Sequence, residues 1–578
     1  MVAILKKRLA SVPPLAWLLL LTLVCLAPFL GKAFFIDDTL FLRAAQQIQK
    51  HPLDFYGFNI NWYGYTTPMT AAMDNPPLTS YYIAFVTSFL GWSEWALHLA
   101  FLLPALAAVW GIYTLAKNYC ERPFTATLVA LLTPVFLISA TAVMCDVMQL
   151  AFWVWTLVFF EKGLRTESRA ALITSGILGG LAFLTKYLAL SLIPLLLAYG
   201  FCRKRRFGWW LVAPLIPLLF VAIYEWLTFR LYGEGLLFAA AHDATRLQAS
   251  YYIIPWEKVI VGLSFAGACF LSVLLYAPVL WGRRIFLVIP CLMAASLLIL
   301  PRMATYTSLM WKVDGGLHWG MFFYVATLVV AGLYVFLLAG MDVWEHRDAV
   351  SILLLLWLSG MFVFTVALNW TIDGRSLLPA VPAVGILTAR RLESKSVHPK
   401  PEFSFRLFAP AFFAGVVSLL LVQADCRLAD SLRASALQLG AKYRLPGKTT
   451  WFNDHWGVQY YLELYGAKVM DCKSPRFSPG DDLLVLDTWG FHAEDFETNH
   501  SIRLRLLQTG EIAGRRCLST ADREADAGFY GTCVGVLPFA VGDVPPQIFK
   551  VYEIVKTAGN AETKRDAHMP AADGSNAG

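Results

Sequence analysis

The sequence predicts a polytopic α-helical membrane protein with about thirteen transmembrane helices and a small C-terminal α/β domain. Two observations predict this fold class. Hydrophobic residues make up 58% of the 578 residues and charged residues 15%, with a mean hydropathy of +0.57, whereas soluble domains average about 45–50% apolar and about 25% charged residues. The apolar residues also gather in uncharged runs of about 20, the length at which a helix crosses the hydrocarbon core of a bilayer.

The first predicted helix covers about residues 12–30 and follows a basic cluster, Lys6-Lys7-Arg8. No small-residue cleavage site precedes Gly31, so we expect a retained helix and not a cleaved signal peptide. Cytoplasmic helix ends carry an excess of Lys and Arg, which predicts a cytoplasmic N-terminus. The helices that follow then place every dense Lys/Arg cluster on that same side.

Twelve further helices are predicted from apolar runs that end at such clusters. They cover about 96–116, 123–142, 147–160, two helices within 170–202 that break at Thr185-Lys186-Tyr187, 209–230, 258–281, 285–301, 318–340, 350–369, 376–390 and 407–423. An odd number of helices places the C-terminal segment outside, together with an unusually long first loop at 31–95. Residues 1–423 are therefore predicted to form the transmembrane domain.

From residue 424 the composition changes to charged residues, Gly-Pro punctuation and short apolar strands. The expected strands include 483–487 and 549–553, and helix-like stretches at 428–442 and 457–465 alternate with them. This alternation predicts an extracytoplasmic α/β domain over 424–556. Cys517 and Cys533 within it pair if this side is oxidising and otherwise stay free. The tail, 557–578, lacks apolar periodicity and is predicted to be disordered.

Three acidic positions are expected on the outer face. Asp37-Asp38 directly follow the first helix, and Asp74 precedes Pro76-Pro77, which fix the entry into the next segment. Adjacent carboxylates are costly to keep beside lipid. A general base near a developing oxocarbenium ion would explain them, and ordinary interfacial polarity is the alternative.

The third acidic residue, Asp146, stands at the outer start of the fourth predicted helix. It interrupts a run from Leu128 to Phe160 that is otherwise free of charge. Buried charges of this kind mark functional positions in membrane proteins. The alternation of the helices therefore predicts that Asp146 converges with the acidic residues of the first loop.

Basic residues also occur on this outer face, where the positive-inside bias works against them. They are Lys186, Arg246, Arg302, Lys312 and Arg375. Two of them, Lys186 and Arg375, stand at tight turns between helices. A lipid-linked phosphate is an anion presented at this depth, and Arg or Lys side chains would hold it. Contact with lipid headgroups is the alternative.

These positions belong to motifs that follow one another in a set order. The motifs are Asp37-Asp38, Asp74-x-Pro-Pro-Leu78, Thr141 to Asp146, Gly180-Leu-Ala-Phe-Leu-Thr-Lys186, and Gly374-Arg375-Ser-Leu-Leu-Pro379-Ala-Val-Pro382. This order resembles bacterial GT-C glycosyltransferases, in particular the lipid A aminoarabinose transferase and the protein O-mannosyltransferases. The resemblance covers about residues 10–425, and it leads us to expect a soluble outer domain after them.

The resemblance implies an inverting transfer of a monosaccharide from a polyprenyl- or dolichyl-phosphate carrier to a lipid, glycan or protein acceptor. Asp37 would match the catalytic acidic residue that deprotonates the acceptor, with Asp38 in place of the usual Glu. Asp146 would match the second acidic position, which orients acceptor or donor. Lys186 and Arg375 would match basic positions near the carrier phosphate.

Two positions depart from the aminoarabinose branch. That branch commonly has Glu-Lys before Pro-Pro, where this chain has Asp74-Asn75, and an Arg shortly after the acidic pair, where this chain has Leu40. The donor then either differs or is held chiefly by the two basic residues just named. Further candidates for the donor site are Asp74 and Arg302.

Other classes of function remain as alternatives. They are a transporter or channel, in which buried charges mark ion pathways, an oligosaccharide ligase or polymerase, and an inactive homologue. The net charge of +7 is too dispersed to indicate nucleic-acid binding. The resemblance implies no cofactor and no essential metal, although three carboxylates can bind Mg²⁺. A bacterial inner membrane, with a periplasmic C-terminal domain, is the expected location.

Overall fold

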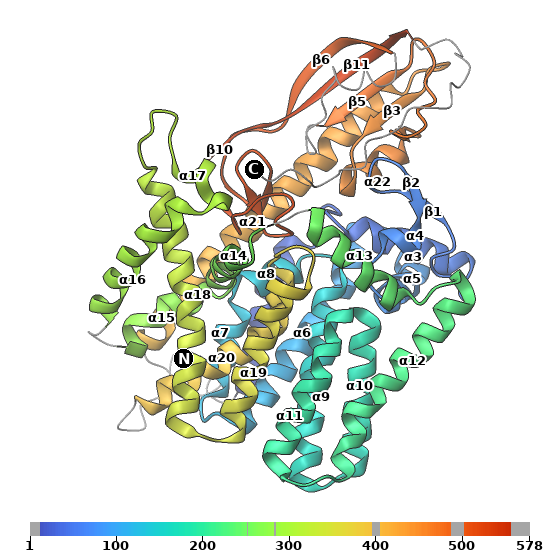
Figure 1. Ribbon diagram of the computed structural model, residues 1–578. Coiled ribbons are helices and arrows are strands. Elements are labelled where there is room, and N and C mark those ends of the chain that lie inside the picture. The colour runs from blue at the N-terminus through green and yellow to red at the C-terminus, as the bar shows by residue number, and fades with distance from the viewer. Residues whose placement is uncertain (1–11, 251–252, 282–284, 396–404, 487–501, 557–578) are drawn as a thin grey trace, which may run out of the picture.

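The computed structural model describes residues 12–250, 253–281, 285–395, 405–486 and 502–556. A helical bundle carries a β-sheet at one of its ends, here called the sheet end (Figure 1). The basic residues 6–8 and 283–284, and the tail 557–578 that was predicted to be disordered, lie outside the described residues.

The bundle is built from apolar helices that follow the predicted runs. They are α2 (Pro14–Leu26), α6 (Glu94–Tyr119), α7 (Pro123–Leu131), α8 (Pro134–Ala140), α9 (Cys145–Thr166), α10 (Arg169–Thr185), α11 (Leu192–Lys204), α12 (Val212–Tyr232), α14 (Pro255–Cys269), α15 (Leu271–Trp281), α16 (Ile285–Ile299), α18 (Trp319–His346), α19 (Ala349–Val363), α20 (Val381–Ser394) and α21 (Phe405–Tyr443). The polytopic helical fold class is confirmed.

The number of membrane spans differs from the thirteen expected. In the described part of the chain, seven helices are long and apolar enough to cross a membrane, and ten if each of three bent pairs is one span. Shorter apolar helices, among them α10 and α15, account for other predicted spans. The count of thirteen therefore stays a prediction.

The run predicted as one helix over 123–142 is broken for a local reason. α7 ends at Leu131, and α8 begins at Pro134 after a bend of 64°. Pro134 lacks the N–H that would continue the helix and disfavours helical geometry at the residue before it. Thr133 then caps α8 by accepting a hydrogen bond from the Phe136 amide.

The outer surface of the bundle has the character of a lipid-facing surface. On α12, Leu215, Leu219 and Trp226 are each more than half exposed. An apolar stripe of this length is unfavourable in water and favourable in hydrocarbon. Together with the spans, this identifies a multi-pass membrane protein.

The long first loop is folded and lies at the sheet end. It contains α3 (Asp38–Lys50), β1 (Asn59–Asn61), β2 (Thr66–Pro68), α4 (Met69–Ala72) and α5 (Leu78–Leu90). β1 and β2 form an antiparallel hairpin. α5 packs on α3, so the loop is a compact layer that holds the N-terminus of α3 against the bundle.

The C-terminal segment forms the predicted α/β unit. Its five-stranded sheet has the order β4-β3-β5-β11-β6. The elements are β3 (Thr450–Asn453), α22 (Trp456–Leu464), β4 (Lys468–Val469), β5 (Asp482–Leu486), β6 (Arg503–Ala513) and β11 (Gln547–Lys556). β3 runs parallel to β4 and β5, and β11 runs antiparallel to β5 and β6. The predicted strands 483–487 and 549–553 correspond to β5 and β11.

α21 connects the bundle to the sheet without a break (Figure 1). The expected boundary between residues 423 and 424 therefore falls inside one helix, which carries the change from apolar to charged composition along its length. The C-terminal α/β unit also contacts the first loop. The hydroxyl of Tyr461 in α22 accepts from the Phe34 amide at 2.9 Å, and the carbonyl of Met470, just after β4, accepts from Asn61 Nδ2 at 2.9 Å.

Candidate active site

The two carboxylates that begin α3 point in different directions. Ile36, the residue before them, is buried and adopts φ +49°, the left-handed region that β-branched residues rarely enter. Such strain is maintained only where surrounding contacts fix the backbone. The turn leaves Asp37 partly exposed and buries Asp38 completely.

The carboxylate of Asp38 accepts hydrogen bonds from the backbone. Its two oxygens accept hydrogen bonds from the amides of Phe35 and Val143, each at 2.8 Å. Burial raises the pKa of Asp38 to about 7, although Lys32 and the two amides oppose this rise. Asp38 thus joins the start of α3 to the turn before α9.

Asp37 faces a single cation. Its Oδ2 lies 2.9 Å from Nη1 of Arg375, the first residue of the short 3-10 helix before α20, and 28% of the Asp37 side chain is exposed. No hydrogen bond to the Asp37 carboxylate from any other side chain is seen in the described ranges. Part of the Asp37 carboxylate is therefore accessible, whereas Asp38 is fully buried.

A second ion pair lies at the start of α9. Lys186 donates from Nζ to Asp146 Oδ1 at 2.7 Å, and the side chain of Asp146 is 3% exposed. Asp146 sits in the first turn of α9, where the helix dipole favours a negative charge. Lys186 is the extended residue at which α10 ends, so the helix break predicted at this residue supplies the cation.

The two pairs are neighbours. Nη1 of Arg375 also lies 2.9 Å from Sδ of Met144, two residues before Asp146. Arg375 interacts electrostatically with both Asp37 and Asp146. Two carboxylates and two cations from the first loop, α9, α10 and the segment before α20 thus meet at the sheet end. The alternation of the helices predicted that they share one side of the membrane.

Asp74 lies beside this cluster, and no ion pair joins it to another described residue. Burial and the neighbouring carboxylates of Asp243 and Asp37 raise the pKa of Asp74 to about 7. Asp243 belongs to α13 (Leu236–Ser250). A half-buried carboxyl among like charges takes up a proton near neutral pH and then donates a hydrogen bond.

Arg302 lies away from the others. It ends the short helix after α16, is exposed, and donates to the carbonyl of Leu298 in its own turn. None of its described contacts involves the two ion pairs. Alternation of the helices predicts only the side of the membrane, and among the described contacts Arg302 meets neither Lys186 nor Arg375.

Candidate metal ligands do not gather here. Among the residues that the structure describes, no group of three His, Cys, Asp or Glu side chains could hold a metal ion. His318 is used structurally, since its Nδ1 accepts from the amide of Met321 at the start of α18. Cys517 and Cys533, for which pairing was left open, are both free.

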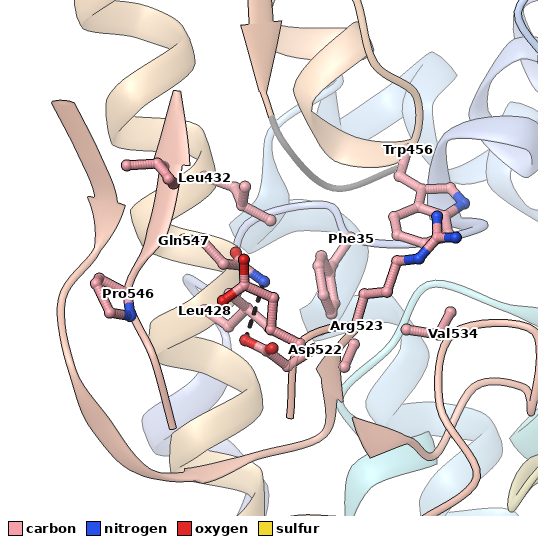
Figure 2. Close-up of a pocket in the computed structure, with 12 residues that line it drawn as sticks. Phe35, Leu428, Leu432, Trp456, Asp522, Arg523, Val534, Pro546 and Gln547 are labelled. Carbon is pink, nitrogen blue, oxygen red and sulfur yellow. Dashed lines mark hydrogen bonds between the residues drawn. The ribbon is translucent and has the colours of Figure 1, made fainter. Parts of the chain in front are cut away.

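A small, open pocket lies beside the residues that precede α3. Phe35, two residues before Asp37, points into it between Leu428 of α21 and Trp456 of α22 (Figure 2). Asp522 lies at its wall and accepts from Gln547 Nε2 at 3.4 Å. The pocket is thus lined both by a residue that precedes α3 and by residues of the C-terminal segment.

One neighbour of the ion pairs had no signal in the sequence. The guanidinium of Arg375 lies 5.4 Å from the ring centroid of Tyr530, in the segment between β9 (Ala527–Gly528) and β10 (Ala540–Val544). Tyr530 lies in the C-terminal α/β domain, in which the sequence predicted no site residue, and only the folded chain shows the contact.

The comparison with known families concerns the segment that supplies three of these residues. Residues 74–228 match the family model of dolichyl-phosphate-mannose-protein mannosyltransferases. This match confirms the resemblance to GT-C glycosyltransferases. The matched segment contains Asp74, Asp146 and Lys186, whereas Asp37 and Arg375 lie outside it. Among curated proteins, no sequence matches the chain.

Solved GT-C structures resemble the chain at low identity. The oligosaccharyltransferase of Archaeoglobus fulgidus, tethered with an acceptor peptide, is 15% identical with a TM-score of 0.45, and the match covers 79% of this chain and 63% of that one. The chain thus spans less than two thirds of that enzyme. ArnT from Cupriavidus metallidurans, bound to undecaprenyl phosphate, is 14% identical with a TM-score of 0.42, covering 85% and 95%.

Proposed function

We propose that the chain is an inverting glycosyltransferase that moves a monosaccharide from a polyprenyl-phosphate carrier to a lipid, glycan or protein acceptor. The observation that carries this proposal is the pair of adjacent ion pairs, Asp37–Arg375 and Asp146–Lys186, at the sheet end of the bundle. The Asp37 carboxylate is partly exposed and can act as a base, and Arg375 and Lys186 are two cations that can bind the departing phosphate.

Asp37 is the general base in this proposal. The acceptor oxygen attacks the anomeric carbon while its proton passes to Asp37. The bond between the anomeric carbon and the phosphate oxygen breaks at the same time, and its electron pair stays on the carrier phosphate. One displacement inverts the configuration at that carbon. Asp38 cannot take this role in the present geometry, because both of its oxygens accept backbone hydrogen bonds.

Arg375 and Lys186 bind the carrier phosphate. Negative charge develops on the phosphate as the sugar leaves, and preorganised cations in a site of low dielectric stabilise that charge. Each cation now contacts a carboxylate, at 2.9 and 2.7 Å. A bound phosphate would contact Arg375 and Lys186 while each keeps its carboxylate partner. Asp146 would keep Lys186 oriented toward the phosphate. With two cations available, we propose that no divalent metal is essential.

The depth of the site supports a lipid-linked donor. α9 has 22 residues and is about 33 Å long at 1.5 Å per residue. Asp146 stands at one end of it, and near the other end Glu161 pairs with Arg203 from a cluster of basic residues. The length of α9 is about that of one bilayer core, which supports a position for Asp146 and Lys186 near the phosphate of a membrane lipid.

The membrane side follows from the same helix. The basic cluster near Arg203 marks the cytoplasmic side under the positive-inside rule. We therefore propose that the sheet end faces away from the cytoplasm, the periplasm in a bacterial inner membrane. The family match, whose description names a dolichyl-phosphate sugar, favours this reading over the transporter alternative.

The proposal is tested by transfer assays with the full chain in proteoliposomes. Wild type, Asp37→Asn and a matched control, Asp314→Asn, are supplied with a panel of polyprenyl-phosphate sugars and mixed acceptors. Asp314 lies in an exposed turn away from the site. We expect turnover with one donor, lost by about 10²–10⁴-fold in Asp37→Asn only. Equal turnover in the Asp37 variant would remove Asp37 from the chemistry.

A further inference from the structure

A loop of the C-terminal domain is joined to the loop that carries Arg375. The Gly374 amide donates to the carbonyl of Phe529 at 2.8 Å, and the Thr532 amide donates to the carbonyl of Ile372 at 3.0 Å. Thr532 Oγ1 also accepts from the Ile372 amide at 3.2 Å. Residues 529–532 and 372–374 thus act as one paired unit, although they belong to different domains.

The fit between these loops depends on Gly374. A Cβ at that position would lie 2.3 Å from the ring of Phe529, closer than side chains tolerate. The ring packs directly on the peptide backbone that precedes Arg375. The domain contact therefore places Tyr530, the next residue, against the Arg375 side chain.

Tyr530 supports the guanidinium of Arg375 through its ring. The guanidinium carbon lies 5.4 Å from the ring centroid, within the range of a cation–π interaction. Nε of Arg375 is buried and has no hydrogen-bond partner among the described residues. Among the described residues, the guanidinium is therefore supported by the ring of Tyr530 and by the contacts of Nη1 with Asp37 and Met144.

Tyr530 is itself fixed from the other side. Its hydroxyl donates to Asp425 of α21 at 2.9 and 3.0 Å. Asp425 is fully buried, accepts from Lys32 Nζ at 2.6 Å and is also bonded by Thr520. A continuous series of contacts thus runs from Lys32 through Asp425, Tyr530 and Arg375 to Asp37.

Stability of the domain contact does not by itself account for this arrangement. A buried ion pair such as Lys32–Asp425 brings little net stability, because desolvation offsets the attraction. What it does provide is a fixed orientation for the tyrosine hydroxyl. An arginine that lacks hydrogen bonds at Nε needs such a rigid neighbour to hold one rotamer next to Asp37.

We propose that Tyr530 is a positioning residue for transfer, which holds Arg375 toward Asp37 and the carrier phosphate, so that the C-terminal domain completes the active site. This inference rests on the proposed function of Arg375. It adds that the domain after the bundle takes part in donor binding and transfer, through a residue that does not touch the reacting atoms.

A double-mutant cycle in the full chain tests this inference. Tyr530→Leu, Arg375→Ala and the double variant are compared in proteoliposomes for kcat, donor KM and binding of undecaprenyl phosphate alone. We expect Tyr530→Leu to raise donor KM and lower kcat/KM at least about tenfold, and to have almost no further effect when Arg375 is already alanine. Tyr530→Phe keeps the ring but loses the hydrogen bond to Asp425, so its effect on donor KM should lie between those of wild type and Tyr530→Leu.

Tyr443→Leu is the matched control. Tyr443 is buried, hydrogen-bonds Gln508 and lies against Lys442 away from the site. Its loss should lower thermal stability without changing KM. Tyr530→Met serves if the leucine variant does not fold. The inference would be overturned if folded Tyr530→Leu or Tyr530→Met had wild-type kcat and KM. It would also be overturned if the effect of the Tyr530 substitution added to that of Arg375→Ala. Binding of undecaprenyl phosphate reports the coupling even if no transfer is found, which separates this inference from the proposed function.

Discussion

Nη1 of Arg375 lies 2.9 Å from Oδ2 of Asp37, across the junction of the first loop with the loop before α20. The cation that faces the proposed base is thus brought in by a distant part of the chain. Because a guanidinium presents several donors in one plane, Arg375 can keep one contact with Asp37 while another donor binds phosphate.

Replacing Arg375 by lysine should impair transfer while the charge is kept. A lysine ammonium is a point charge without the planar fork, and it cannot hold the same contacts together. We expect Arg375→Lys to lower kcat/KM by about 10–100-fold, with Arg375→Ala lower still. Steady-state kinetics in proteoliposomes measure this, and Arg347→Lys, at an exposed helix end, is the matched control. Full activity of Arg375→Lys would show that charge alone is needed there.

Asp37→Asn should impair transfer without lowering stability, whereas Asp38→Asn should lower stability. Asparagine at position 38 has one accepting oxygen, so one of the amides of Phe35 and Val143 loses its acceptor in a buried place. An unpaired buried donor costs about 1–3 kcal/mol. Thermal unfolding should therefore show a clear loss of stability for Asp38→Asn and little change for Asp37→Asn. A stable but inactive Asp38→Asn would instead make Asp38 part of the chemistry.

Asp146 and Lys186 should be interdependent in stability. Lys186→Met leaves the buried carboxylate of Asp146 without its partner, which costs about 3 kcal/mol. Adding Asp146→Asn removes that charge and should restore much of the lost stability, while transfer stays abolished. Thermal unfolding and donor binding, measured on the same preparations, separate the two effects. Recovery of transfer in the double variant would contradict a phosphate-binding role for Lys186.

Donor binding should depend on pH through Asp74. Its pKa is raised to about 7, so the carboxyl is protonated and able to donate below that pH and charged above it. If the protonated form contacts the donor, KM should rise by up to about tenfold per pH unit above 7. Asp74→Asn, which always donates, should flatten the profile.

Asp243→Asn is a second check on that titration. After burial, the Asp243 carboxylate is the largest cause of the raised pKa of Asp74. Removing it lowers the pKa of Asp74, so the rise in KM should begin at a lower pH. A profile that is unchanged in both variants would exclude Asp74 from donor binding.

The sequence predicted which residues share one end of the bundle, because helix ends alternate between two sides. Asp37, Asp146, Lys186 and Arg375 were expected there and do meet, although their roles stay predictions. Alternation carries no information about position within the membrane plane, which is why Arg302 was grouped with them and lies elsewhere. Long apolar runs predicted spans, but a break such as Thr133–Pro134 depends on local backbone chemistry.

Contacts between the domains were beyond prediction from the sequence. Tyr530 is one of many tyrosines, and no spacing connects it to Arg375. The domain boundary also lies within the continuous helix α21. The composition of this helix changes from apolar to charged along its length, while its backbone stays helical. Only packing of the C-terminal segment on the first loop shows that the sheet and the site are neighbours.

The most direct test of the central claim is single-turnover transfer by Asp37→Asn, with donor binding measured on the same proteoliposomes. Asp37 as the general base predicts that the variant binds the polyprenyl-phosphate sugar about as tightly as wild type and transfers it at least about 100-fold more slowly. Wild-type transfer rates in a variant that binds donor normally would contradict that role.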